Sequence, residues 1–440
     1  MDPVRKRVRA GHSGKAKFPL TNRIPMNKYL LSAACIAAAL LPHPGHAQTD
    51  PPASAPAANT IADEYNDPDT GARVLHLSKG IDGPAGVIYF TQACITPDGR
   101  YALVRNLAPT AGHTAGLMYR YDFKTGDVVK LTDRMTRNQV MVPKSGNLYY
   151  TSDNDTAIYV TNILDMTTRK VADIPPDLIC SGGLTVNADE SLVVGTATLA
   201  KDEPKGPPST TPPNQGPGLN NTFEKHNLNM LIDADIKTGK VNILHKINTW
   251  LGHTQFSPTD PDLLMYCHEG PWQLVDRIWT MHISDQKPQL VLKRTVDGEI
   301  AGHEFWGADG TTVWYDHNFR GTPGGKHFLE GKNLTTGVVT QYPITAPFQS
   351  IHYTQSPDGK FFVCDGGTVR GNPSAQAMYA LVPDNGKLDP IKLCSMAKNN
   401  YTDAEPNPHL TPDQHWDLFT ATFSGISKAY AVEMPKQFWR

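Results

Sequence analysis

The chain has 440 residues, among them 36 glycines and 36 prolines, and its formal net charge at pH 7 is −2. So many turn-forming residues predict short elements and few long helices. Nothing in the overall charge supplies the basic excess that nucleic-acid binding requires, so no nucleic-acid partner is expected.

The first 47 residues differ in kind from the rest. Basic residues precede an apolar run at 30–41, and Gly45 and Ala47 form a small-x-small cleavage site. This order is typical of a secretory signal peptide and predicts a periplasmic or secreted protein. Met26 is an alternative start, because the segment that follows it already contains a basic and an apolar part. The apolar run is too short to span a bilayer, so the mature protein is expected to have no membrane span.

Cleavage after residue 47 removes eight of the 41 Lys and Arg residues and one of the 43 acids, which leaves 33 basic and 42 acidic residues, or about −9. An anionic ligand must then be bound by a local cluster of Arg, His or metal. Five cysteines remain: Cys94, Cys180, Cys267, Cys364 and Cys394. They are widely spaced and odd in number, which favours buried thiols, with one disulfide as the alternative.

Residues 48–60 resemble a flexible linker, and a repeat follows in 61–440. A turn signal before an alternating apolar run occurs seven times. The seven turns begin at Thr96, Lys144, Asn187, Ser257, Ala308, Ser356 and Thr411. Most units contain a second turn, as in DFKTGDVVKL and DIKTGKVNIL. The Pro-rich stretch 201–222 interrupts the repeat and is expected to be a long loop over one mouth of the ring.

This recurrence, at a period of about 45–50 residues, predicts an all-β, seven-bladed β-propeller. Residues 72–78 and 429–434 are expected to pair and close the ring. Two separate β-sandwiches are the alternative fold. The fold by itself does not indicate an activity.

Polar residues recur at the equivalent position of several blades, just before the first turn. They are Gln92, His253, His303, His352 and His409. Equivalent positions in a propeller face the same mouth of the channel, so these side chains are expected to gather there. For each histidine, a structural role within a blade turn is the alternative.

The segments WLGHTQFSPTDPDLLMYCHEGPWQLVDRIW and GHEFW resemble the oligogalacturonate lyase family, whose members are seven-bladed propellers that cleave pectin fragments. The resemblance is dense between residues 250 and 306 and weak elsewhere. It implies that His253 is the catalytic base and that His303 is a ligand of a divalent metal, generally Mn²⁺.

The family's remaining metal ligands, in a Q-x-x-H-x-H pattern, fall on Thr402, Glu405 and Asn407. Glu405 and Asn407 offer oxygen ligands on one face of a strand, which suits Mn²⁺ or Ca²⁺ better than Zn²⁺. His409 is a further candidate ligand on the same face.

β-Elimination from a uronate removes the proton α to a carboxylate. A metal on that carboxylate stabilises the developing charge, and a neutral imidazole takes the proton. The expected substrate is a short uronate-containing oligosaccharide. Its candidate binding residues are Gln92, His268, Glu269, Arg277 and His352, with Arg277 as the bidentate partner of a neighbouring uronate.

Two alternatives stay open. The altered ligand positions favour a non-catalytic periplasmic propeller that binds a protein or a sugar. The predicted export also fits elimination on a different uronide. The four tryptophans Trp272, Trp279, Trp306 and Trp314 are expected to belong to blade cores rather than to sugar platforms.

Overall fold

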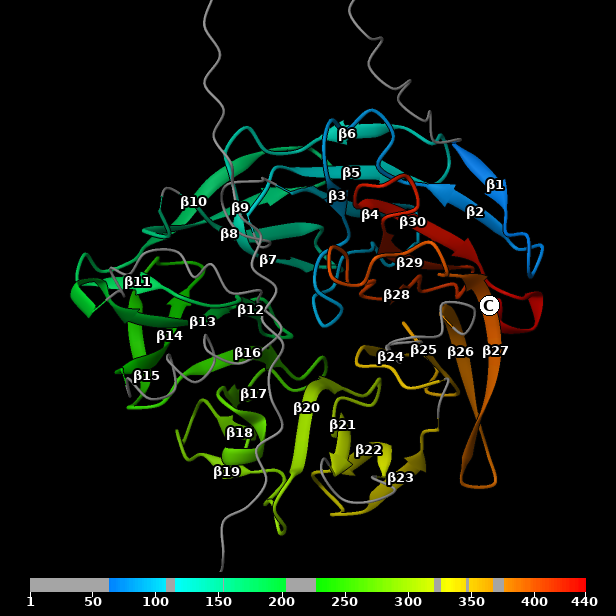
Figure 1. Cartoon of the computed structure of the whole chain (residues 1–440). Helices are drawn as coiled ribbons and strands as arrows, with labels where there is room; N and C mark the ends of the chain where they lie inside the picture. Colours follow the sequence, from blue (N-terminus) through cyan, green and yellow to red (C-terminus); the bar gives the residue numbers. More distant parts are fainter. Residues whose placement is uncertain are drawn as a thin grey trace, which may run out of the picture. The chain divides into compact units, whose positions relative to one another are not determined.

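The computed structural model describes residues 63–107, 115–152, 154–202, 227–319, 326–345, 348–366 and 376–440. These residues belong to one compact unit, Asn59–Arg440, and form seven antiparallel sheets with only short 3-10 turns besides. Figure 1 shows the sheets following one another around a ring. The predicted seven-bladed β-propeller is confirmed. The expected signal peptide, the linker and positions 203–222 of the Pro-rich stretch lie outside the described residues.

Six blades are built from strands that are consecutive in the chain. These blades are β3–β6 (Ala85–Gly86, Tyr101–Asn106, Met118–Asp122, Val128–Lys130), β7–β10 (Arg137–Val142, Asn147–Ser152, Ala157–Asn162, Thr168–Asp173), β11–β15 (Leu178–Cys180, Thr185–Val186, Leu192–Leu199, Asn229–Asp235, Val241–Ile247), β16–β19 (Leu251–Phe256, Leu263–His268, Ile278–His282, Gln289–Leu290), β20–β23 (Glu299–Trp306, Thr312–Phe319, His327–Asn333, Val339–Pro343) and β24–β27 (Tyr353–Gln355, Phe362–Cys364, Ala377–Asp384, Lys387–Ser395). The 3-10 turns among the described residues are Ala200–Asp202, Trp272–Leu274 and Lys436–Phe438. None of the helical segments described is long and apolar enough to cross a membrane.

The seventh blade combines both ends of the domain. Its strands are β28 (His409–Leu410), β29 (Trp416–Ala421), β30 (Lys428–Glu433), β2 (Arg73–His76) and β1 (Glu64–Asn66). β2 and β30 pair antiparallel, with Val74 opposite Val432. The predicted pairing of these two segments is therefore confirmed, and it closes the ring with hydrogen bonds between the two ends of the domain.

The repeated turn between the first two strands of a blade is stabilised by its own side chains. In the first blade Thr96 Oγ1 donates to Asp98 at 2.6 Å and accepts the Tyr101 amide at 3.0 Å. The last turn position requires the left-handed region, which Gly99 adopts at φ +68°. Gln414 takes the equivalent position in the seventh blade at φ +57°. The turn signals in the sequence are thus explained by this local chemistry.

Apolar side chains on the two faces of each sheet pack against the neighbouring blades. Val194 and Leu231 of the third blade, for example, share a fully buried cluster with Leu264 and Tyr266 of the fourth. Full burial of one such side chain stabilises a fold by about 1.5–3 kcal/mol. The five cysteines of the domain are all buried and unpaired, which confirms the expected thiols over the disulfide.

The strands β7, β16, β24 and β28, each the first of its blade, lie toward the middle of the ring (Figure 1), and several first strands carry an irregularity. Asn138, His253 and His303 have φ near +50°, as does Asn407 just before β28. The strand register shifts at the first three of these positions. Non-glycine residues seldom adopt this conformation, and bulges of this kind redirect side chains next to functional sites.

Candidate active site

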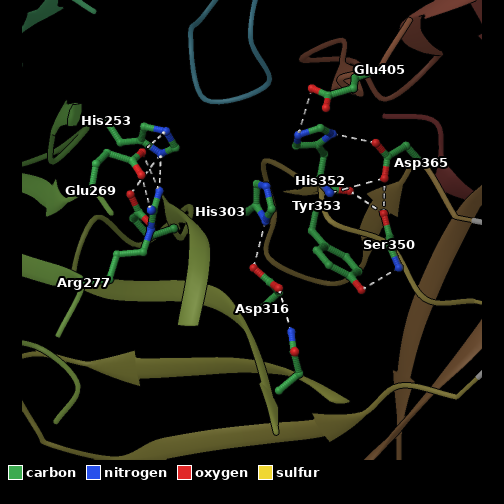
Figure 2. A network of polar contacts seen from close by, with 12 residues as sticks. His253, Glu269, Arg277, His303, Asp316, Ser350, His352, Tyr353, Asp365 and Glu405 are labelled. Carbon is green, nitrogen blue, oxygen red and sulfur yellow. Dashed lines mark hydrogen bonds and ion pairs between the residues drawn. The ribbon is translucent and has the colours of Figure 1, made fainter. Parts of the chain in front are cut away.

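His253 lies at the bulge of β16, and both of its ring nitrogens face carboxylates. Nε2 is 3.1 Å from Glu269 Oε1, and Nδ1 is 3.1 Å from Glu304 Oε1. Arg277 joins the two acids, donating to Glu269 at 2.7 Å and to Glu304 at 3.2 Å. Figure 2 shows His253, Glu269 and Arg277 as one group. Two acids and two bases therefore form a compact buried network.

The charges of this network depend on one another. Burial lowers the pKa of His253, but Glu304 and Glu269 outweigh that effect and raise it to about 9. Burial likewise raises the pKa of Glu304, and Arg277 and His253 overcome it, so that the pKa falls to about 2. The network thus favours an ionised Glu304 and a protonated His253 at neutral pH.

Two further histidines face one another from neighbouring blades. The rings of His303 on β20 and His352, just before β24, are 5.1 Å apart between centroids. His303 Nδ1 lies 2.9 Å from Asp316, and His352 Nδ1 lies 2.6 Å from Asp365. A carboxylate on Nδ1 fixes the ring and leaves Nε2 for a metal ion, which is the usual arrangement around protein-bound cations.

Glu405 completes this second group. Its Oε2 is 3.9 Å from His352 Nε2, and its side chain is 51 % exposed. In Figure 2 Glu405 lies above His352, Asp365 lies beside the His352 ring, and Asp316 lies below the neighbouring His303. Two imidazole nitrogens and one carboxylate, backed by two further carboxylates, make a donor set that fits a divalent cation.

The two groups are neighbours. The ring of Tyr89 lies edge-on against His253 at 5.5 Å and against His352 at 5.7 Å between centroids. A cavity of about 460 Å³ opens beside them, within the size range of small-molecule sites. His253, Glu405 and Gln92 all line it. The structure therefore brings together the predicted base, a predicted metal ligand and a predicted substrate-binding residue.

Gln92 contributes an unsatisfied group to this cavity. Its Oε1 is buried and has no hydrogen-bond partner among the residues that the structure describes. An unpaired buried amide oxygen costs stability unless a ligand or water bonds to it. Gln92 is therefore well suited to accept a hydrogen bond from a sugar hydroxyl.

Two of the residues singled out in the sequence, His268 and Arg277, have other surroundings. His268 stacks on Trp279 at 4.8 Å, and burial lowers its pKa to about 4. It follows Cys267 and precedes Glu269 on the strand, so its ring points away from the network. Arg277 is 3 % exposed and is held by Glu269 and Glu304, which leaves it no free face for a sugar. These two residues lie outside the cavity lining.

Asn407 and His409 both hold the segment before β4. Asn407 Oδ1 accepts the Phe90 amide at 3.2 Å, and its Nδ2 donates to the Glu405 carbonyl at 3.0 Å. His409 Nε2 lies 3.0 Å from the Ile88 carbonyl. The Asn407 amide oxygen is thus already bonded, whereas the Glu405 carboxylate faces His352.

Glu304, Asp316 and Asp365 are site residues to which sequence reasoning gave no role. Two of them have a detectable signal, since both Asp316 and Asp365 follow their histidine by 13 positions. In each of these blades a carboxylate on the second strand or directly after it supports a histidine on the first strand or directly before it. Glu304 has no such signal, because it directly follows a candidate metal ligand in the sequence.

One other cluster has the composition of a metal site. Ligand atoms of His253, Cys267 and Glu269 lie within 4.8 Å of one another. Burial raises the pKa of the Cys267 thiol well above its usual value, so it stays protonated. Arg277 already neutralises Glu269. These two features disfavour a cation there and leave His253 available for proton transfer.

The sequence of this chain matches the model of the oligogalacturonate lyase family over residues 58–387. The chain belongs to the oligogalacturonate lyase family. This confirms the resemblance carried by the WLGH, CHEGPW and HEFW segments and supports an enzyme of the lyase class over a non-catalytic binding protein.

Individual relatives of the family cover most of the chain. The oligogalacturonate lyase of Dickeya dadantii is 26 % identical over 407 residues, which are 86 % of this chain and 97 % of the relative. The oligogalacturonide lyase of Pectobacterium atrosepticum is 25 % identical over 399 residues, 85 % and 96 % of the two chains. A solved oligogalacturonate lyase in complex with manganese is 25 % identical and superposes with a TM-score of 0.72 over 86 % of this chain and 97 % of the other.

Proposed function

We propose that this protein cleaves short uronate-containing oligosaccharides by metal-assisted β-elimination. The observation that carries the proposal is that a carboxylate-supported histidine, His253, and a pair of carboxylate-supported histidines, His303 and His352, are joined through the ring of Tyr89 beside a cavity that His253 and Glu405 line. The relatives named oligogalacturonate lyase support oligogalacturonates as the substrate class.

His253 is the proposed base. When its proton passes to solvent, one ring nitrogen becomes free to take the proton α to the uronate carboxylate. Arg277 and Glu304 hold the ring in place and set its pKa. As the proton leaves, the bond between the sugar ring and the leaving oxygen breaks, a conjugated double bond forms next to the carboxylate, and the leaving oxygen takes up a proton from solvent.

The proposed metal ligands are His303, His352 and Glu405. A bound divalent cation supplies Lewis-acid stabilisation of the uronate carboxylate as the α proton leaves. Two imidazoles with one carboxylate suit Mn²⁺ better than Ca²⁺, which prefers all-oxygen sites. The manganese complex of the solved relative supports the same ion. The assignment adds His352 to the ligands expected from the resemblance and gives Asn407 the role of holding the Phe90 and Glu405 backbones.

We also propose that the protein is exported. Residues 1–47 have the basic start, apolar run and small-x-small site of a signal peptide, and 48–60 resemble a linker. A periplasmic or extracellular position would bring the enzyme into contact with uronides before their uptake. Mass spectrometry of the protein purified from the exporting cell tests this, with a mature N-terminus at Gln48 as the expected result.

The test of function uses purified protein and digalacturonate, with the ultraviolet absorbance of the new conjugated double bond as the readout. Activity is expected after addition of Mn²⁺ and is expected to disappear with a chelator. His303→Ala and His352→Ala should each lower metal affinity, measured by calorimetric titration, by about tenfold or more. The absence of any unsaturated product across a panel of uronides, with Mn²⁺ bound, would contradict the proposal.

A further inference from the structure

The cavity beside His253 contains few positive charges for a site that takes an anionic ligand. Its charged lining residues include Asp403 and Glu405, which repel a carboxylate. Arg105 is the only Lys or Arg among the described residues that line it. A substrate with two carboxylates needs one cationic partner for each, and the proposed metal centre supplies the partner of only one of them.

Arg105 is positioned from two blades. It lies on β4, with its backbone opposite Gly86, and its NH1 donates to Gln139 Oε1 at 3.2 Å. Gln139 belongs to β7 of the next blade, and its Nε2 donates to the Thr136 carbonyl and hydroxyl, both at 2.9 Å. These bonds orient the Gln139 amide so that its oxygen faces the guanidinium, and they hold Arg105 at the cavity wall.

Burial also makes this position receptive to an anion. Removal from water lowers the pKa of Arg105 to about 10, so the group remains charged at neutral pH but lacks full solvation. An incoming carboxylate can form two parallel hydrogen bonds with a guanidinium, and such charge-assisted pairs are about twice as strong as neutral ones.

Arg277, the arginine expected to bind the uronate, lies in different surroundings. It is 3 % exposed, does not line the cavity and is paired with Glu269 and Glu304. Any carboxylate that approached it would have to displace one of these acids. Its role is to support His253, and the positive charge that reaches the substrate must come from another residue.

We propose that Arg105 binds the carboxylate of the uronate next to the one that undergoes elimination, and so makes the enzyme specific for unesterified di-uronates. The inference rests on the proposed function. A metal held from blades five to seven and Arg105 on blade one would then bind two different carboxylates, and Gln92, His253 and Glu405 line the same cavity as Arg105.

The experiment compares wild type with Arg105→Gln and Arg105→Lys. The Gln variant is expected to raise KM for digalacturonate about ten- to a hundredfold with little change in kcat, because a charge-assisted pair is lost in substrate and transition state alike. The Lys variant should show an intermediate effect, since it keeps the charge but not the bidentate geometry.

Digalacturonate esters make the test specific. Methyl esterification of the ring away from the metal should weaken binding to wild type by a similar factor, but should have little further effect on Arg105→Gln, because both changes remove the same contact. Calorimetric binding in the presence of Mn²⁺ measures this independently of turnover. Arg100→Gln, which breaks an ion pair with Asp122 outside the cavity lining, is the matched control.

The outcomes separate the two proposals. Failure of the wild-type protein to bind or cleave any uronide contradicts the proposed function itself. Normal cleavage by wild type, together with unchanged KM and unchanged ester discrimination in folded Arg105→Gln, overturns the role of Arg105 alone. If Arg105→Gln does not fold, as judged by circular dichroism, the Lys variant and the ester series on wild type still decide: wild-type affinity for the monoester on the ring away from the metal that equals its affinity for digalacturonate contradicts the proposal.

Discussion

At the residue scale, the pKa of the proposed base, His253, is set by the charged groups around it rather than by the imidazole alone. With a pKa of about 9, only about one His253 ring in a hundred is neutral at pH 7. Glu304 is an important cause of that shift, and it also holds Arg277. The same carboxylates that orient the imidazole therefore keep it protonated until the pH rises or the substrate changes its surroundings.

This leads to a prediction for the pH profile. Because the base must be neutral, kcat/KM is expected to increase about tenfold per pH unit from pH 7 and to level off near pH 9. Glu304→Gln removes a negative charge next to His253, so the pKa of the imidazole falls and the midpoint of the rise moves to lower pH. Steady-state kinetics between pH 6 and 10 with Mn²⁺ present measure both effects.

Glu330→Gln is the control for that experiment. Glu330 is another buried carboxylate in the same blade, where it accepts from Tyr315 and faces His317, and it does not line the cavity. Its loss should lower stability without moving the midpoint. A midpoint that stays in place in Glu304→Gln, or an activity that falls between pH 7 and 9, would rule out His253 as the base in this network.

At the element scale, two strands contain the same kind of β-bulge. β16 and β20 each contain a Gly-His pair at which the register shifts and the histidine takes φ +49°. The glycine leaves room for a side chain from the adjacent segment: a Cβ on Gly302 would lie 2.8 Å from Trp272. Trp272 in turn packs against His303 at 4.9 Å and under Arg277 at 4.8 Å. The bulge and its glycine therefore connect the base network to the metal ligands.

Gly302→Ala should disturb this connection. The added methyl group forces Trp272 to move, which costs about 1–3 kcal/mol of stability and displaces the His303 ring. We expect a lower unfolding midpoint together with a Mn²⁺ affinity reduced by about tenfold, measured by thermal unfolding and calorimetric titration.

A matched change separates overpacking from site geometry. In the same blade, a Cβ on Gly331 would lie 2.6 Å from Trp314, whose ring contacts Tyr342 and Phe362, and neither Trp314 nor these two neighbours lines the cavity. Gly331→Ala should therefore lower stability to a similar degree and leave Mn²⁺ affinity intact. Equal losses of metal affinity in both variants would show that the Gly302 contact has no special role.

At the scale of the whole molecule, the ring depends on its mixed seventh blade. β2 supplies Val74 to the core, and Leu77, which directly follows this strand, is buried there as well. Both side chains are 0 % exposed. Leu75 is 7 % exposed. Burial of these three side chains contributes about 1.5–3 kcal/mol each, a sum comparable with the net stability of a typical domain, about 5–15 kcal/mol.

A chain that begins at residue 79 is accordingly expected to lose cooperative unfolding, while a chain that begins at residue 63 should unfold like the protein cleaved after residue 47. Differential scanning calorimetry of the two shortened chains makes the comparison. A normal, cooperative transition in the shorter chain would show that β1 and β2 do not contribute to closure of the ring.

The sequence by itself determined the repeat and the strands. Each turn signal acts through neighbours a few positions away, as in the Thr96–Asp98 turn, and strand alternation is equally local, so the seven blades and their closure could be predicted. The histidine-containing segments WLGH, CHEGPW and HEFW likewise indicated the family, because each of these motifs is a continuous stretch of sequence. The 13-residue spacing from His303 to Asp316 is also visible in the sequence, but it indicates a contact between the two side chains only when the pairing of their strands is known.

Only the tertiary structure decided which polar side chains meet. His352 comes next to His303, Arg277 is enclosed by two acids, and Arg105 reaches the cavity wall because neighbouring blades bring together residues far apart in the chain. The protonation states of the site residues also depend on the tertiary structure, because the pKa of His253 is raised by Glu304, which lies 51 positions away in the chain. Contacts and burial between blades have no local signature, and for that reason the roles within the site emerged from the fold and not from the motifs.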